Sequence, residues 1–515
     1  MKWLGKTVAR SFDLFDTLIA RRCNDPLTIF EIVEARSGLR GFAAARKEAE
    51  RRAKLSGEYT IDTIYNEIPN LLDVSEGAAD VLKALEIETE IEEVIPIAEN
   101  IRLVRDGDII VSDMYLPADV LRQMLVKAGI RKNVEIFVSA RGKSTGKIWR
   151  QVRRRYHIAF HIGDNAYSDF RSAVRRAIPA RISRASRFSD SERMFSDMDA
   201  NVLALMVRQA RLSLWHDDWL MRRLQRLQAG LNLPLLLLAS LRLLEVVEEV
   251  GATRLLFCAR DGNLWISLFR KVAQLLGVEI EAEYFFTSRP ARLSCSQNYR
   301  AYCRGRLNDR ALVVDIGGTG WSLSSLADTL GMSSVNCFFI HHIPQLSSYE
   351  QLRPMKDNVK VYSLLSREDG ALYNAVLEMC NYADHASVLD VEFRDGEVMP
   401  IWMPETRNAD ELRAVAVQRE AFLQSIDVVG ASMLRSIQGI APEKRKEVCI
   451  AIYRRIMDER ALSFMFQKVH STEDQATLVG LGAASKVERG AGTLDAAVAQ
   501  VKRRIRRCQL RVGLR

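Results

Sequence analysis

The sequence predicts an α/β protein with two successive α/β regions, separated and followed by helical segments. Apolar, strand-like runs at residues 106–114, 134–140 and 159–164 each lead into a helix-like segment. A second series of such runs begins at residue 254. Alternating strands and helices are typical of a parallel sheet that is covered by helices. We therefore expect two separate parallel sheets.

The first region is expected to cover residues 1–188. Residues 8–18 read as a strand that runs into a turn rich in carboxylates. Residues 26–104 are rich in Ala, Glu, Arg and Leu at helical spacing, and no convincing strand occurs among them. The pattern predicts a helical insertion after the first strand, at about residues 24–104.

A helical linker is expected at residues 189–250. Its most apolar stretch, residues 231–244, contains Pro234 and Arg242 and is too short to cross a bilayer. We interpret this stretch as a buried helix.

The second α/β region is expected at residues 251–403. Asp395-Gly396 lies between two alternating runs, which predicts a hairpin turn. Residues 404–515 have a helical pattern with a basic end. The strand-like runs of this region are residues 254–262, 282–291, 311–320 and 335–342.

Composition places the chain among ordinary globular proteins. It has 515 residues, of which 48% are hydrophobic and 27% are charged. The 8 cysteines form no C-x-x-C pair and have no histidine cluster nearby, so we expect neither a zinc site nor a disulfide framework. Free cysteines favour a reducing compartment, the cytoplasm.

The basic end contributes much of the net charge of +9. Residues 494–510 place apolar side chains on one helical face and arginines and lysines around it. Packing of that face against the second region is the favoured reading, and peripheral contact with an anionic membrane is the alternative. We expect no specific nucleic-acid partner.

Polar groups follow four strands of the first region, where ligands of open α/β sheets bind. A carboxylate such as Asp13 can attack a phosphoryl group. A serine and a lysine can stabilise the charge of that group, and two aspartates can hold Mg²⁺. Each residue alone is common in a turn, but their order predicts a site. The candidates are Asp13, Ser112, Lys143 with Lys147 as a rival, Asp164 and Asp169.

This order resembles the four motifs of haloacid-dehalogenase-like (HAD) hydrolases, over about residues 8–185. The resemblance implies a Rossmann-like core with a helical cap, and Asp13 as the nucleophile. It also implies Mg²⁺ bound by Asp13, a backbone carbonyl near Phe15, and Asp164, with Asp169 as the further metal-site carboxylate.

The segments SFDLFDTL, VSDMYLP and GDNAYSD resemble a narrower bacterial group of HAD proteins. Members of that group carry an extra C-terminal region and are associated with surface-polysaccharide synthesis. The resemblance implies glycan-assembly proteins as partners.

One position departs from the pattern of HAD phosphatases. Their acid/base aspartate stands two residues after the nucleophile, where this chain has Phe15, followed by Asp16. Dehalogenases of the superfamily tolerate an aromatic residue there but need no metal, whereas Asp164 and Asp169 are retained here.

The leading hypothesis is Mg²⁺-dependent hydrolysis of a small phosphorylated metabolite, a sugar or nucleotide phosphate, with Asp16 as a displaced acid/base. The alternatives are a weak or inactive HAD-like protein that binds or regulates polysaccharide assembly, and a dehalogenase-like hydrolase.

The second region has its own candidate site for an anion. Glycine-rich turns bring backbone N–H groups close to phosphates, and arginines bind anions with forked donors. Ordinary strand–turn–helix chemistry explains the same residues equally well. We interpret His341-His342 as a core or rim pair. The candidates are Arg260, Asp261, Arg289, Arg292, Asp315, Gly317, Gly318 and Gly320.

Overall fold

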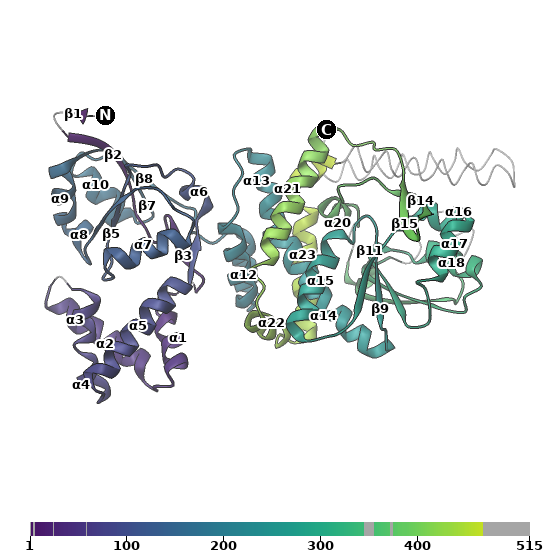
Figure 1. Ribbon diagram of the computed structural model, residues 1–515, viewed down its shortest axis with the longest axis horizontal. Helices are drawn as coiled ribbons and strands as arrows, with labels where there is room; N and C mark the ends of the chain where they lie inside the picture. Colours follow the sequence, from purple (N-terminus) through teal and green to yellow (C-terminus); the bar gives the residue numbers. More distant parts are fainter. Residues whose placement is uncertain are drawn as a thin grey trace. The chain divides into compact units, whose positions relative to one another are not determined.

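The computed structural model is a mixed α/β protein in which contacts divide the chain into two compact units, Met1–His216 and Asp217–Arg515 (Figure 1). Residues 189–216 of the expected linker therefore belong to the first unit and residues 217–250 to the second. The structure describes residues 2–3, 6–23, 25–57, 59–343, 355–370 and 374–466. The basic helix expected at residues 494–510 lies outside the described residues.

The first unit contains a parallel sheet, as the sequence predicts. Its strand order is β6-β5-β2-β7-β8, and β1 pairs with β2 in the antiparallel sense. Numbered along the chain, the five parallel strands run 3-2-1-4-5, so the order reverses between β2 and β7. Ligands of open α/β sheets bind at such a reversal, outside the carboxyl ends of the strands. The strands are β1 (Lys2–Trp3), β2 (Lys6–Phe12), β5 (Ile109–Ser112), β6 (Glu135–Val138), β7 (Tyr156–Gly163) and β8 (Ala180–Ile182).

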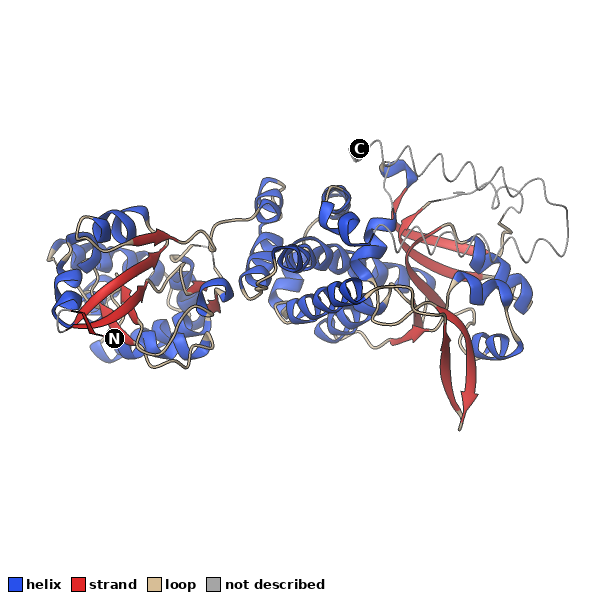
Figure 2. Cartoon of the chain, turned by 90° about the horizontal axis from the view of Figure 1, so that it is seen from above, coloured by secondary structure: helices blue, strands red, loops and turns tan. Residues whose placement is uncertain are grey.

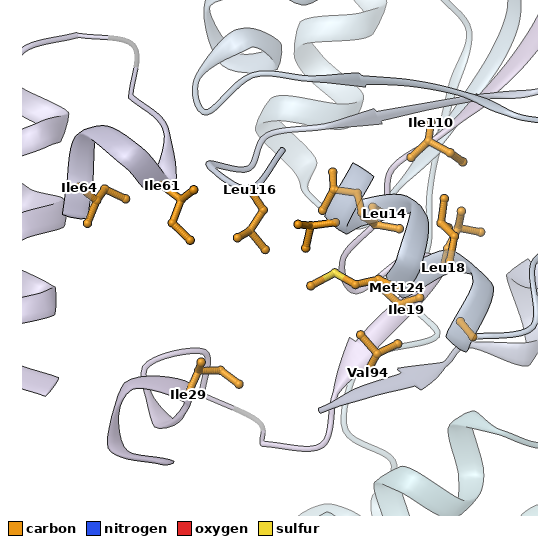
Figure 3. Packing of buried hydrophobic residues seen from close by; sticks show 14 of the residues in the cluster. Leu14, Leu18, Ile19, Ile29, Ile61, Ile64, Val94, Ile110, Leu116 and Met124 are labelled. Atoms are coloured by element: carbon orange, nitrogen blue, oxygen red, sulfur yellow. The ribbon is translucent and has the colours of Figure 1, made fainter. Parts of the chain in front are cut away.

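The expected helical insertion follows β2 and packs on the sheet domain. Its core is continuous with that of the sheet, because Ile29, Ile61 and Ile64 of the insertion belong to the same buried cluster as Leu14 and Ile110 (Figure 3). Its helices are α1 (Thr28–Ser37), α2 (Phe42–Leu55), α3 (Ile61–Tyr65), α4 (Ile68–Leu72) and α5 (Glu76–Glu92).

A two-stranded ribbon joins the insertion to the sheet domain. In it, β3 (Ile19–Arg21) pairs antiparallel with β4 (Val94–Pro96). The expectation that residues 26–104 hold no strand is therefore wrong at β4. Three residues are too few to show a hydrophobic period, so the sequence pattern gave no signal for this strand.

Most of the remaining helices of the first unit follow the strands of its sheet, whereas α12 packs against α11 and the β3–β4 ribbon. Residues Ala166–Arg171 form a π-helical turn, η1, directly after β7. The helices are α6 (Ala98–Ile101), α7 (Ala118–Lys127), α8 (Gly142–Thr145), α9 (Lys147–Arg155), α10 (Ser172–Val174), α11 (Asp190–Asp197) and α12 (Asn201–Leu212).

The second unit begins with a long apolar helical segment. Trp219–Val250 is long and apolar enough to cross a membrane by length and composition, but 89% of its most apolar window is buried inside the protein. The expectation of a buried helix at residues 231–244 is thus confirmed. The segment consists of α13 (Trp219–Leu227), the π-helical turn η2 (Gln228–Asn232) and α14 (Leu233–Val250).

The second sheet is also parallel, with the order β10-β9-β11-β12-β13. Along the chain this is 2-1-3-4-5, so the reversal lies between β9 and β11. The fifth strand, β13, lies outside the four strand-like runs expected from the sequence. Helices lie against the strands of both sheets (Figure 2). The strands are β9 (Arg254–Cys258), β10 (Glu281–Phe285), β11 (Ala311–Gly318), β12 (Val335–His342) and β13 (Val359–Ser366).

The expected hairpin is formed by β14 (Val388–Arg394) and β15 (Glu397–Trp402). Its turn residues Asp395 and Gly396 have φ values of 51° and 82°, as a two-residue turn of this kind requires. The other elements of the unit are α15 (Asn263–Leu276), α16 (Arg289–Ser294), α17 (Gln297–Arg304), α18 (Trp321–Leu330), η3 (Arg367–Asp369), α20 (Asn374–Asn381), α21 (Ala409–Ile426), α22 (Ala431–Gln438) and α23 (Pro442–Met457).

Candidate active site

Asp13 is the first residue beyond β2, at the reversal of strand order in the first sheet. Its backbone N–H donates to the carbonyl of Ile162 in β7 at 2.8 Å, which fixes the start of the loop. Phe12 and Leu14, on either side, are fully buried and anchor the loop in the core. The Asp13 side chain is therefore held in place at the carboxyl edge of the sheet.

Lys143 connects Asp13 with Asp169. Its Nζ donates to Asp13 Oδ1 at 2.6 Å and to Asp169 Oδ1 at 2.5 Å. Its backbone is fixed as well, because its N–H donates to Asp113 Oδ1 and its carbonyl accepts from Ser172 Oγ. The rival candidate Lys147 is exposed at the start of α9. The structure thus places Lys143 in the cluster.

Three carboxylates converge around this lysine. Oxygens of Asp13, Asp164 and Asp169 lie within 4.8 Å of one another. Three carboxylates and one ammonium leave an excess of negative charge, and hard oxygen donors at this spacing suit a divalent cation such as Mg²⁺. The donor set therefore fits Mg²⁺, the metal expected from the sequence.

The titration of these groups follows from burial and mutual repulsion. Burial raises the pKa of Asp13, and the charges of Asp169 and Asp164 raise it further, against the lowering effect of Lys143. Burial, followed by the charges of Asp16 and Asp169, raises the pKa of Asp164 to about 6. Burial also acts on Asp169, but the hydrogen bond from His161 and the charge of Lys143 outweigh it and lower its pKa to about 2. A bound cation would relieve the repulsion among the three.

His161 of β7 lies next to Asp169, and the sequence did not identify it as a site residue. Its Nε2 lies 3.3 Å from Asp169 Oδ1, and its Nδ1 lies 2.8 Å from Ser11 Oγ. Its ring also meets the edge of Trp149 at 4.9 Å between centroids. This fully buried histidine holds the Asp169 carboxylate in place. In the sequence, His161 is one residue within an apolar strand-like run, and nothing in the pattern marks it as part of a site.

Gly163 is the residue that lets Asp169 approach. A Cβ at this position would lie 2.3 Å from the carboxyl carbon of Asp169, so a side chain would displace that carboxylate. We expect Gly163→Ala to weaken Mg²⁺ binding and to destabilise the protein by about 1–3 kcal/mol, as overpacking does.

Calorimetric titration with Mg²⁺ and urea unfolding would measure both effects. Gly77→Ala is the matched control, because a Cβ there meets nothing within 4 Å and the residue lies in the first turn of α5. Equal Mg²⁺ affinity in the two variants would contradict the role of Gly163.

Asp16 lies in the same loop and has a left-handed backbone, with φ 55°. Arg208 of α12 reaches it with an Nη2–Oδ1 distance of 3.3 Å, although 192 residues separate them in sequence. The Arg208 side chain is 5% exposed and that of Asp16 is 46% exposed. Asp16 thus faces solvent, while its charge acts on Asp164. No local pattern could have identified Arg208.

Ser112 is the last residue of β5, the neighbour of β2, and is 2% exposed. Adjacent strand ends place it beside the loop of Asp13. The sequence candidates of the first region other than Lys147 therefore lie at one edge of the sheet.

The second unit brings part of its candidate set together around Arg292. This buried guanidinium donates to Thr287 Oγ1 at 2.9 Å, to Ser322 Oγ at 3.1 Å and to Cys258 Sγ at 3.1 Å. It also lies 3.5 Å from Asp315 Oδ2. Arg292 and Asp315 therefore tie together the ends of β9 and β11.

Arg260 and Asp261 form a second group, after β9. The Arg260 guanidinium lies over the ring of Tyr382 at 4.2 Å, and its Nε is 3.4 Å from Asp261 Oδ1. Arg289, in contrast, is exposed at the start of α16.

The glycines of the second candidate set have steric roles. A Cβ on Gly317 would lie 2.2 Å from the Asn374 amide nitrogen, a Cβ on Gly318 would lie 3.1 Å from the Phe339 ring, and Gly320 has φ 79°. His341 is buried and bound to Asn374, while His342 is half-buried and stacks on Phe339.

No known family profile matches the chain, and no curated protein sequence matches it.

Proposed function

We propose that the first unit is a HAD-like core with a helical cap that hydrolyses phosphate monoesters with the aid of Mg²⁺. The observation that carries the proposal is Lys143, whose ammonium contacts both Asp13 and Asp169. An Asp164 carboxylate oxygen lies within 4.8 Å of oxygens of these two aspartates. A buried carboxylate that is paired with a cation and placed at the switch point of a parallel sheet is suited to attack a phosphoryl group.

In the proposed reaction, an Asp13 oxygen attacks phosphorus and forms an aspartyl-phosphate while the bond to the leaving alcohol breaks. The alcohol takes up a proton. Water then attacks phosphorus, restores the Asp13 carboxylate and releases inorganic phosphate. Lys143 and Ser112 would stabilise the charge on the phosphoryl oxygens. Bound Mg²⁺, held by Asp13, Asp164 and Asp169, would add electrostatic stabilisation.

Asp16 is the proposed acid/base for this reaction. Phe15 occupies the position that the resemblance assigns to the proton donor, and phenylalanine cannot transfer a proton. Asp16 is the next residue, and its charge raises the pKa of Asp164. The contact with Arg208 would hold its carboxylate at the edge of the site.

Paired variants test this assignment. We expect Asp16→Asn to lower kcat for phosphate esters by about 10²- to 10⁴-fold, the usual contribution of a general acid/base. Phe15→Asp is expected to raise activity on substrates with poor leaving groups. Turnover of aliphatic phosphate esters with and without Mg²⁺ would measure both effects. Full activity of Asp16→Asn would contradict the assignment.

The second candidate is a catalytically weak protein that binds or regulates partners in glycan assembly. The observation in its favour is the packing of Phe15, which lies against the buried cluster shared by the sheet and the insertion and has the Arg21 guanidinium over its ring. Such packing is what a residue that stabilises the fold would show, and Phe15 would then have no part in proton transfer. An inert wild type together with an active Phe15→Asp variant would favour this candidate. For both candidate functions, we propose that the protein acts in the cytoplasm.

A further inference from the structure

Arg21 lies close to the loop of the nucleophile. It is the last residue of β3, on the ribbon that leads into the insertion. Its guanidinium carbon lies 4.2 Å from the centroid of the Phe15 ring. Phe15 is only two residues from Asp13, so Arg21 reaches from the insertion to the nucleophile loop.

Glu90 of α5 holds the Arg21 guanidinium by one edge. Arg21 Nε donates to Glu90 Oε2 at 2.7 Å, and Nη2 donates to Glu90 Oε1 at 2.9 Å. The Arg21 side chain is 10% exposed and that of Glu90 is 1% exposed. With the stacking on Phe15, these bonds fix the plane of the guanidinium.

The third nitrogen of this guanidinium is open. Within the described residues, Nη1 makes no hydrogen bond to the chain, and it is not among the fully buried polar atoms that lack a partner. It therefore contacts solvent. A fixed cation with one open donor edge is preorganised to bind an oxyanion, because little entropy is lost when the bond forms.

Contacts along α5 place Arg21 near the carboxyl edge of the sheet. Tyr115 belongs to the loop after β5. Its hydroxyl donates to Glu86 Oε1 at 3.4 Å, and Glu86 lies one turn of α5 before Glu90, which binds Arg21. Arg21 therefore lies near the loops that follow both β2 and β5, which are the loops that carry Asp13 and Ser112.

We propose that Arg21 binds a second anionic group of the substrate. The substrate is then a phosphate monoester that carries a carboxylate or a second phosphate, with one group at Asp13 and the other at Arg21. The inference rests on the proposed function, since it takes Asp13 as the phosphoryl site. If Arg21 only ties β3 to α5, its contact with Glu90 is explained but its open edge has no role.

Matched pairs of ligands test this inference by binding, without turnover. In each pair a carboxylate replaces a hydroxymethyl group: 3-phosphoglycerate against glycerol 3-phosphate, and 6-phosphogluconate against sorbitol 6-phosphate. Affinities are measured by calorimetry on the full chain carrying Asp13→Asn, with Mg²⁺. We expect the acid of at least one pair to bind about 10- to 100-fold more tightly, the range for a hydrogen bond to a charged group.

The preference should depend on Arg21. Arg21→Gln alone would leave Glu90 buried without its partner, so Arg21→Gln/Glu90→Gln, in the Asp13→Asn background, is the informative variant. We expect it to lose the preference for the acid while its affinity for the neutral ligand stays within about twofold, a change below 0.5 kcal/mol. Arg36→Gln is the control, because Arg36 is an exposed arginine of the same insertion that pairs with Glu88 and Glu92.

Equal affinities within both pairs, or an unchanged preference in the double variant, would overturn the inference. Failure of the proposed function has a different signature, namely no hydrolysis of any of the four esters by the wild type. Hydrolysis of acid and neutral esters with equal KM would leave the function standing and remove Arg21 from recognition.

Discussion

Asp13→Asn is expected to lower the turnover of phosphate esters by about 10⁴-fold or more, as loss of a nucleophile does. An amide is a poor nucleophile, yet its oxygen can still accept the hydrogen bond from Lys143 that Asp13 Oδ1 accepts at 2.6 Å. The variant should therefore fold normally. Release of inorganic phosphate from a panel of esters, with and without Mg²⁺, would measure the loss.

Asp190→Asn is a matched control for this experiment. The Asp190 side chain is 78% exposed and pairs with Arg193 at the start of α11. We expect its turnover to equal that of the wild type. If Asp13→Asn retained wild-type turnover, the aspartyl-phosphate route would be refuted.

Arg46→Met is expected to destabilise the protein by about 3–5 kcal/mol, the usual cost of breaking a buried ion pair. Arg46 and Glu86 are both fully buried in the insertion, and they are joined by bonds of 2.7 and 2.8 Å. Removing the arginine leaves the Glu86 charge in the core. Tyr65 donates a hydrogen bond to that carboxylate but does not neutralise it.

Urea unfolding of the full chain would measure this change, and a double variant separates the charge from the packing. In Arg46→Met/Glu86→Gln neither charge of this pair is left in the core, and the amide oxygen still accepts from Tyr65. We expect the double variant to be more stable than Arg46→Met alone. Arg51→Met is the control on the same helix, because the Arg51–Glu48 pair is exposed and should contribute about 0–1 kcal/mol. A loss for Arg46→Met no larger than for Arg51→Met would contradict the importance of the buried pair.

The sequence was most informative at strand ends. The runs that became β5, β6 and β7 are apolar and short, and each ends where a polar residue begins. Because hydrophobic period is a local property, it located these strands and the residues after them. Asp13, Ser112 and Asp164 were found in this way. A parallel sheet then brings its strand ends to one edge, whatever the strand order.

Side-chain contacts between distant segments could not be predicted from the sequence. Nothing local distinguishes Lys143 from Lys147, since both lie in the same short loop pattern; only the fold turns one toward Asp13 and leaves the other exposed. His161 was missed because it reads as one more strand residue. The short strands β4 and β8 were missed because three residues show no period.

The sequence by itself determined the α/β class, the helical insertion and the set of carboxylates that follow the strands. Only the tertiary structure decided that Arg208 contacts Asp16 and that Arg21, held by Glu90, covers Phe15. The physical reason is the same for both contacts. Each contact joins side chains from distant elements. Their pairing depends on how the insertion packs on the sheet and how α12 packs on the β3–β4 ribbon, which no period or spacing in a single sequence encodes.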